Sequence, residues 1–320
     1  MRGLRRSALV AALGLAVVLA LSACAPRAGE WTDEQYRIAG GGATGVYFDY
    51  GGHLAHELSD SLDIDVVVEE TGGSVDNLLR VAAGDALLGF AQGDAAADAV
   101  AGVGAFDAPL DVRAVARLYD EYVHVVVRAD SAVDDISDLA GKTVSLGAEN
   151  SGVNVIANRV LDAAGVERAA VRDPELDLRE SIAAMEQGEI DGFFWVGGLP
   201  TPGIQELAIE LPVRLLPIEQ EWITAVNERY SDAYRPADFP VGTYGLTESA
   251  PTMAVPNYLL AAASTPDAVI RDVLQSLFDA RSRMGAEVPA AALLNRRQAI
   301  FTAPVELHPG AIDYYRDRGR

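Results

Sequence analysis

Residues 36–45 read Tyr-Arg-Ile-Ala-Gly-Gly-Gly-Ala-Thr-Gly, a short predicted strand that runs straight into a glycine-rich loop before a predicted helix around His53–Leu62. The same succession of strand end, small residues and helix start occurs at 71–74, 92–94 and 147–152. Glycine lets a ligand approach the backbone, and free N–H groups at a helix start favour an anion. Because open α/β sheets bind ligands at the carboxyl ends of their strands, these four loops are candidate parts of one site.

Strand-like and helix-like runs alternate on both sides of the glycine loops. Further strands are expected at 64–69, 87–91, 122–128, 143–146 and 190–195, and further helices at 75–83, from 94, at 152–164 and at 181–187. This alternation predicts an α/β fold with a largely parallel sheet.

The pattern restarts after the strand at 122–128, which predicts two lobes joined by two crossings. The second crossing and its loops are expected at 222–244, and residues 254–320 are expected to be mainly helical. The first lobe would then hold residues 36–122 and 236–320, and the second lobe would hold residues 123–235.

The net charge excludes one large class of partners. The 320 residues hold 25 Lys and Arg against 47 Asp and Glu, a net charge of −22. Since Arg2, Arg5 and Arg6 are the charged residues of 1–23, the rest of the chain stands at 22 − 47 = −25. Nucleic acids and anionic lipids are bound by clusters of Lys and Arg, so neither is an expected partner.

The amino terminus is typical of an exported protein. Three arginines precede the apolar run Ala8–Leu21, which is too short to span a bilayer but fits the apolar region of a secretory signal. The run ends in Leu-Ser-Ala-Cys at 21–24, which resembles the bacterial lipobox, whose cysteine is lipidated. We expect a signal peptide at 1–23 and a lipid-anchored tether at 24–35, so that Cys24 holds the protein on the outer face of the cell membrane.

The single cysteine limits other chemistry. With Cys24 alone, an intrachain disulfide and a thiolate zinc cluster are both excluded. The alternative to lipidation is a buried cysteine that follows an ordinary cleavage site.

Two further motifs leave alternative interpretations open. Gly40-x-Gly42-x-x-Gly45 matches a dinucleotide fingerprint, and Glu69 and Glu70 follow the next strand, where a ribose-binding acid belongs. Bulky side chains after Gly45 oppose that interpretation, and nicotinamide cofactors are scarce outside the cell, so no cofactor is expected.

The second motif, His53-x-x-His56, places two imidazoles on one helix face. A zinc site needs three or four ligands, and neither His124 nor His308 has a spacing that links it to the pair, so no metal is expected. The sequence contains no Gly-x-Ser-x-Gly elbow, and we expect no enzymatic activity.

Several stretches spread over about residues 36–318 together form a recognisable set. They are Gly42–Phe48, Thr71–Leu78, Gly89–Asp94, Leu118–Tyr119 with Val123–Val127, Leu139–Gly147 with Ser151–Gly152, Ile190–Pro200 and His308–Ile312. In this order they resemble the solute receptors of TRAP transporters, TAXI subfamily.

The resemblance implies a two-lobed, periplasmic-binding-protein-like (type II) fold, in which each lobe is a mostly parallel sheet flanked by helices and the ligand cleft lies between the lobes. It also implies capture of a small organic anion (glutamate, 2-oxoglutarate or another dicarboxylate) and its delivery to the membrane permease subunits of a TRAP transporter. The alternatives are an ABC-type receptor of the sulfonate- or thiamine-precursor-binding kind and a membrane-tethered ligand sensor.

Carried over position by position, the resemblance implies eleven ligand-facing residues: Thr44, Gly45, Tyr47, Ser74, Asn77, Gln92 and Asp94 in the first lobe, and Ser151, Gly152, Trp195 and Gly198 in the second. The chain departs from the family with Phe48-Asp49 in place of Tyr-Pro and with Gly93 in place of Ser, which removes hydroxyls and adds a negative charge.

Simpler roles stand beside the implied ones. Ser74, Asp94 and Ser151 are also candidate helix caps, and Trp195 is a candidate core residue. Arg113, Arg117 and Arg128 flank the first crossing, where one of them could pair with a ligand carboxylate, although exposed positions are the ordinary place for arginine.

Overall fold

The computed structural model describes residues 31–32 and 34–319. The description below concerns the unit that begins at Gln35. The expected signal peptide and the lipidation site at Cys24 lie outside the described residues.

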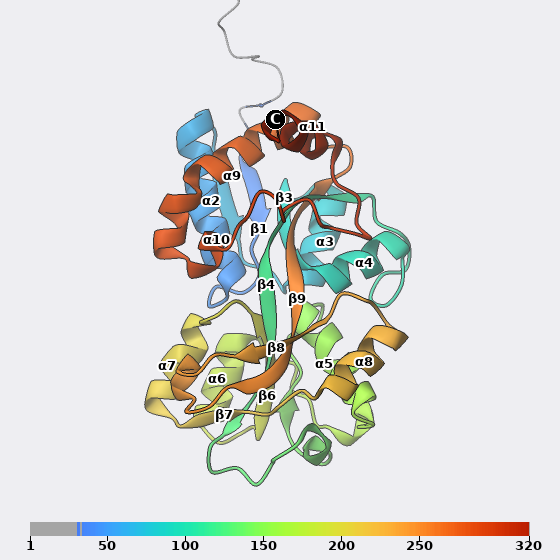
Figure 1. Cartoon of the computed structure of the whole chain (residues 1–320), viewed down its shortest axis with the longest axis vertical. Helices are drawn as coiled ribbons and strands as arrows, with labels where there is room; N and C mark the ends of the chain where they lie inside the picture. Colours follow the sequence, from blue (N-terminus) through green and yellow to red (C-terminus); the bar gives the residue numbers. More distant parts are fainter. Residues whose placement is uncertain (1–30, 33, 320) are drawn as a thin grey trace, which may run out of the picture. The chain divides into compact units, whose positions relative to one another are not determined.

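The first lobe joins three parallel strands to a set of helices (Figure 1). Strand β1 (Tyr36–Ala39) pairs in parallel with both β2 (Val66–Glu69) and β3 (Leu88–Gln92). Its helices are α2 (Val46–Leu62), α3 (Ser74–Ala83), α4 (Gly93–Ala101), α9 (Asp267–Glu287), α10 (Pro289–Ala292) and α11 (Pro309–Arg318). The expected order of strand, loop and helix therefore occurs three times in this lobe.

Two long antiparallel strands run through both lobes (Figure 1). Strands β4 (Val112–Arg128) and β9 (Ala250–Ala262) pair with each other, and β9 also pairs with β3 of the first lobe. In the second lobe, β4 pairs with β6 (Gly192–Gly197) and β9 pairs with β8 (Arg235–Phe239). At about 3.3 Å per residue, a strand as long as β4 spans roughly 55 Å, which is enough to serve both lobes.

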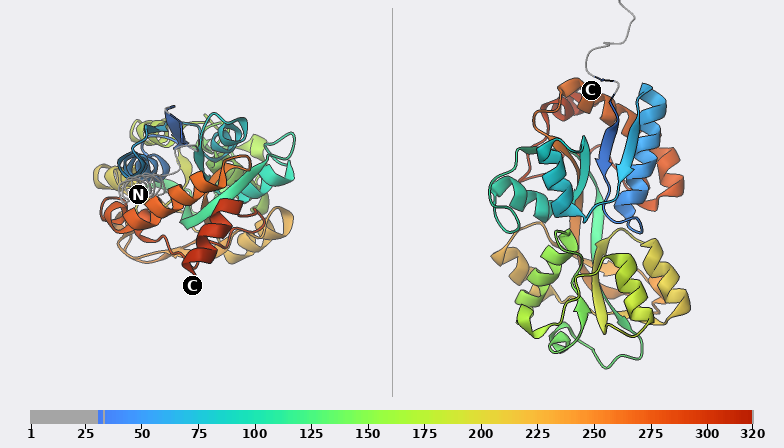
Figure 2. Two further views of the ribbon diagram at one scale, coloured as in Figure 1. Left: turned by 90° about the horizontal axis from the view of Figure 1, so that it is seen from above. Right: turned by 180° about the vertical axis from the view of Figure 1, so that it is seen from behind.

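The second lobe completes the sheet. Its remaining strands are β5 (Val144–Ser145), parallel to β6, and β7 (Val213–Leu215), antiparallel to β4. Its helices are α5 (Gly152–Ala163), α6 (Leu178–Glu186), α7 (Pro202–Glu210) and α8 (Gln220–Arg229), with 3-10 turns η1 (Ile136–Leu139), η2 (Arg168–Ala170) and η3 (Thr243–Gly245). Seen from behind in Figure 2, these green and yellow segments form a body distinct from the blue and teal segments of the first lobe.

The strands of residues 35–319 form one sheet in the order β2-β1-β3-β9-β4-β6-β5, with β7 beside β4 and β8 beside β9. This arrangement confirms the two-lobed α/β fold. Antiparallel pairing is more extensive than the sequence predicted, because β4 and β9 pair with every neighbouring strand in antiparallel fashion.

The chain returns to the first lobe later than the sequence predicted. Residues 222–244, the expected second crossing, form most of α8 and all of β8, and Phe239 and Tyr244 pack in a core of the second lobe. The return takes place within β9, so residues 236–249 belong to the second lobe. Residues 254–262, expected to be helical, are part of the same strand. Proline is rare in strands, and the prolines of β8 and β9 weaken the signal for this hairpin.

Helix α2 begins seven residues before the predicted start, at Val46. Its buried face includes Tyr50, Gly51, Leu54 and Leu58, which follow helical spacing. A Cβ at Gly51 would lie 2.9 Å from a methyl group of Val68, so the glycine lets the helix pack closely on β2. The aromatic and glycine residues at 47–52 therefore belong to a helix and not to a loop.

Candidate functional site

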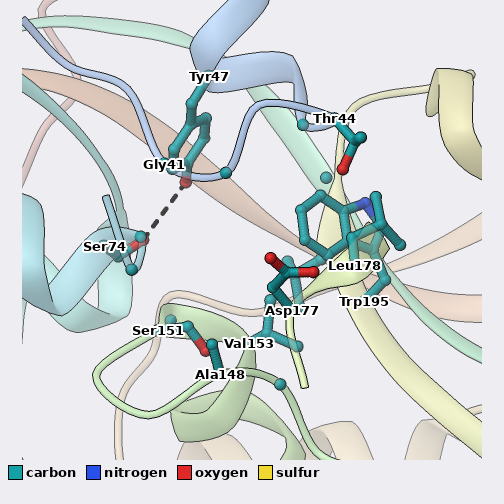
Figure 3. Close-up of a pocket in the computed structure, with 18 of the residues that line it drawn as sticks. Gly41, Thr44, Tyr47, Ser74, Ala148, Ser151, Val153, Asp177, Leu178 and Trp195 are labelled. Carbon is teal, nitrogen blue, oxygen red and sulfur yellow. Dashed lines mark hydrogen bonds between the residues drawn. The ribbon is translucent and has the colours of Figure 1, made fainter. Parts of the chain in front are cut away.

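A cavity of about 240 Å³ lies between the two lobes (Figure 3). Residues of all four glycine loops line it, because the loops follow β1, β2, β3 and β5 at the strand ends that face the cavity. Eight of the eleven residues proposed from the sequence are among the lining residues: Thr44, Gly45, Tyr47, Ser74, Gln92, Ser151, Gly152 and Trp195.

The first lobe contributes a hydrogen-bonded wall. The hydroxyl of Tyr47 lies 3.4 Å from Ser74 Oγ (Figure 3) and donates to Glu121 Oε2 at 3.0 Å. Ser74 Oγ accepts from the backbone N–H of Gln92 at 3.2 Å. Because Gly73 is the N-cap of α3, the alternative interpretation of Ser74 as a helix cap is wrong.

The second lobe contributes the facing wall. Ser151 is the N-cap of α5, where its Oγ accepts from the backbone N–H of Asn154 at 3.0 Å. Trp195 donates its indole N–H to Thr201 Oγ1 at 3.0 Å. Asp177 is the N-cap of α6, and Figure 3 shows its carboxylate pointing into the cavity between Trp195 and Ser151.

Most amides of the glycine loops brace the loops themselves. Gly41 N–H donates to Thr71 Oγ1 at 2.8 Å, Gly72 N–H to Asp76 Oδ2 at 3.0 Å, and Gly45 N–H to Gly42 O at 2.9 Å. The first N–H groups of a helix have no partner within that helix, so the starts of α2, α3 and α5 are what the loops offer to an anion. Of the loop amides expected to bind the ligand, those at the helix starts are therefore the ones that remain available.

Three residues proposed from the sequence are not among those that line the cavity. Asn77 is buried and ties the Thr71 loop to β3, since it accepts from Thr71 Oγ1 and donates to Phe90 O at 2.8 Å. Gly198 packs near Tyr119 and Ala290.

Asp94, the third of them, joins the lobes behind the cavity wall. Its Oδ2 accepts from Arg159 Nη1 of α5 at 2.8 Å and from the hydroxyl of Tyr234 at 2.5 Å. Arg159 Nη2 also pairs with Asp98. Gln92 is the N-cap of α4, so Asp94 is not a cap either.

Glu121, which the sequence analysis did not single out, is a fully buried acid in the cavity wall. It accepts from Tyr47 and, at 3.1 Å, from Tyr119. Burial raises the pKa of Glu121 to about 8, although hydrogen bonds from Gln92, Tyr47 and Tyr119 act in the opposite direction. The sequence signal is a carboxylate within the apolar strand that follows Leu118-Tyr119.

Replacing Glu121 by glutamine is expected to stabilise the ligand-free protein at pH 9 but not at pH 5. When folding raises the pKa of an acid, the protonated acid stabilises the fold fully below the unfolded pKa. For Glu121 this stabilisation is lost as the pH rises from about 4.5, the usual value, to about 8, the value in the folded protein. The whole shift corresponds to at most about 5 kcal/mol. Melting temperatures of wild type and Glu121→Gln at the two pH values measure the difference, and a difference that does not grow with pH would contradict the assignment.

The arginines that flank the first crossing do not reach the cavity. Arg113 pairs with Asp111 at 3.3 Å, Arg117 with Asp120 and Arg128 with Asp130 at 3.0 Å. None of the three is a lining residue of the cavity in the described part of the chain.

The histidine pair and the acid of the dinucleotide-like motif lie near charged residues on their own or neighbouring elements. His53 and His56 lie 3.7 Å and 3.6 Å from Asp49 and Asp60, and the described residues contain no group of three or more His, Cys, Asp or Glu that could hold a metal ion. Glu69 pairs with Arg37 at 2.7 Å. Across residues 31–32 and 34–319, no helix combines the length and the apolar character needed to cross a membrane.

Solved structures share this fold at low sequence identity. MatC from Rhodopseudomonas palustris with bound malate aligns with a TM-score of 0.56 at 15% identity, covering 88% of this chain and 97% of that one. PhnD1 from Prochlorococcus marinus in complex with methylphosphonate gives 0.54 at 11% identity, covering 90% and 97%. The alkanesulfonate-binding protein SsuA from Xanthomonas axonopodis bound to MOPS gives 0.50 at 16%, covering 89% and 85%.

These similarities identify the fold as the type II periplasmic-binding-protein fold. The model of one family matches residues 38–319, which is nearly all of the described part of the chain. The chain belongs to the NMT1-like family.

Proposed function

We propose that this protein is an extracytoplasmic solute receptor that closes its two lobes over a small organic anion and delivers it to the permease subunits of a TRAP transporter. The observation that carries the proposal is the convergence of four glycine loops, from both lobes, on one cavity. Helix starts from opposite lobes meet there, and two-lobed binding proteins close around their ligands by hinge motion.

Several features favour transport over catalysis. The three solved structures with the same fold contain bound malate, methylphosphonate and MOPS, respectively. The cavity wall is made of caps, helix starts and hydrogen-bonded side chains, with no nucleophile paired to a base among its described lining residues. Its acceptor groups and apolar side chains suit recognition of a ligand.

The double change Ser74→Ala with Gln92→Ala is expected to weaken solute binding by at least about tenfold, because it removes two buried polar groups from the cavity wall. A thermal-shift screen of small carboxylates first finds a ligand, since a ligand at 100 times its dissociation constant adds about 2.7 kcal/mol of stability. Calorimetry then compares the variant with wild type. Unchanged affinity in a folded variant would refute this site.

We also propose that Cys24 carries the lipid anchor on the outer face of the cell membrane. The variant Cys24→Ser is expected to leave the membrane fraction, because acyl chains supply the membrane affinity of such proteins. Fractionation of cells that express wild type or Cys24→Ser measures the change. Continued sedimentation of the variant with membranes would count against lipidation.

A further inference from the structure

The charged side chains of the cavity wall are all acidic. Four acids line it, namely Glu70, Glu121, Asp177 and Glu180, while no Lys, Arg or His is among its described lining residues. A ligand with two carboxylates would enter this surrounding without a single basic side chain to neutralise it. Buried charges in proteins are ordinarily paired, so the wall favours a ligand that brings a positive charge of its own.

One acceptor of this wall has no partner, and the carboxylate of Glu121 keeps free acceptor positions. Gln92 is 2% exposed, and its Oε1 has no hydrogen-bond partner among the described residues. The carboxylate of Glu121 receives hydrogen bonds from Tyr47, Tyr119 and Gln92, all neutral donors, and a carboxylate has about four acceptor positions. The two groups together leave room for a donor that carries charge, such as an ammonium group.

The remaining walls define the other parts of the ligand. Most of the large apolar lining comes from the second lobe, namely Val153, Leu176, Leu178, Phe194, Trp195 and Val196, and Val46 adds to it from the first lobe. Anion-binding capacity is confined to the helix starts. At α3 the N–H of Asp76 already donates to Asn150 O at 3.2 Å, so we consider the starts of α2, at Val46 and Tyr47, and of α5, at Gly152 and Val153. A ligand that uses every wall has one ammonium group, one carboxylate and an apolar side chain.

We propose that the cavity takes an α-amino acid with an apolar side chain, whose ammonium group lies against Glu121 and Gln92 Oε1 and whose carboxylate lies at the starts of α2 and α5. This inference rests on the proposed function and narrows its ligand from organic anions in general to a zwitterion. Dicarboxylates without an amino group are correspondingly poor ligands.

Matched pairs of probes that differ in the amino group test the proposal directly. L-leucine is compared with 4-methyl-2-oxopentanoate, L-phenylalanine with phenylpyruvate, and L-glutamate with 2-oxoglutarate, by thermal shift and then by calorimetry on the full chain. We expect leucine or phenylalanine to bind at least about tenfold more tightly than its oxo acid and than glutamate. If an oxo acid or a dicarboxylate binds more tightly, or if no amino acid of the three binds, the proposal is overturned.

The pH dependence gives a second, independent readout. Tyr47 and Tyr119 face Glu121, and burial raises the pKa values of both tyrosines. Burial also raises the pKa of Glu121 to about 8, so the charge of Glu121 changes between pH 6 and pH 8. An ammonium group needs the ionised carboxylate, so affinity for the amino acid should rise at least about tenfold from pH 6 to pH 8. A fall in affinity would mean that protonated Glu121 donates to a ligand anion.

Substitution at Glu121 separates this inference from the proposed function. Glu121→Gln keeps the shape of the side chain and removes its charge, so it should lose at least about tenfold in affinity for the amino acid and lose the pH dependence. The control is Glu206→Gln on the exposed side of α7, which removes one charge far from the cavity. If Glu121→Gln binds as wild type does while Ser74→Ala with Gln92→Ala does not bind, the receptor function stands and the ammonium assignment falls.

Discussion

Replacing Gly152 by valine is expected to weaken solute binding by at least about a hundredfold while both lobes remain folded. Gly152 opens α5 in the second lobe, and a Cβ at this position would overlap Gln92 Oε1 and lie 2.7 Å from Ser74 Oγ in the first lobe. Overpacking of a buried contact costs about 1–3 kcal/mol. In Gly152→Val the overlap disappears when the lobes separate. The substitution therefore raises the free energy of the closed state and leaves the stability of each lobe unchanged.

Solution scattering and calorimetry together test this outcome. With saturating ligand, wild type should contract, whereas Gly152→Val should keep the radius of gyration of the ligand-free protein. The control is Gly52→Ala on α2, where a Cβ would be 3.7 Å from a methyl group of Val68, an ordinary contact distance. If Gly152→Val contracted normally and bound with wild-type affinity, the contact between Gly152 and Gln92 could not be part of the closed state.

The four glycine loops could be predicted from the sequence because each is a local pattern. A strand end, small residues and a helix start lie within a few positions, and the topology of parallel strands then places the loops at one edge of the sheet. Ser151 at the start of α5 is recognisable for the same reason. The late return through β9 could not be predicted, because Pro251 and Pro256 weaken its strand pattern, Pro236 weakens that of its neighbour β8, and its other partners, β3 and β4, lie far away in sequence.

Glu121 and Arg159 illustrate what local patterns leave out. Both charged residues have buried apolar residues nearby on their elements: Tyr119 and Val123 lie two positions from Glu121 in β4, and Ile156 and Val160 flank Arg159 on α5. A charge in such a position indicates a buried partner, but the sequence does not say which one. The partners of Arg159 are Asp94 and Asp98, more than 60 positions earlier in the chain. The ligand-facing role expected for Asp94 rests on the family resemblance alone, and no local pattern indicates its pairing with Arg159.

Replacing Arg159 by methionine is expected to shift the ligand-free protein toward an open arrangement and to weaken solute binding by at least about tenfold. The Arg159 side chain is 8% exposed. Its guanidinium donates to Asp94 and Tyr234, pairs with Asp98 and lies 5.0 Å from the centre of the Tyr230 ring. Breaking one partner of a buried ion pair costs about 3–5 kcal/mol, because the other charge is left without compensation.

In Arg159→Met this free energy favours opening of the lobes. Helices α4 and α5 belong to different lobes, so separation of the lobes exposes Asp94 and Asp98 to water. Arg229→Met is the matched control, since Arg229 and Asp162 form a pair that is about half exposed on each side, and exposed pairs contribute little to stability. Adding Asp94→Asn and Asp98→Asn to Arg159→Met removes the uncompensated charges and should recover part of the affinity. If Arg159→Met lowered the melting temperature but left the radius of gyration and the affinity unchanged, the cluster would stabilise the fold without controlling closure.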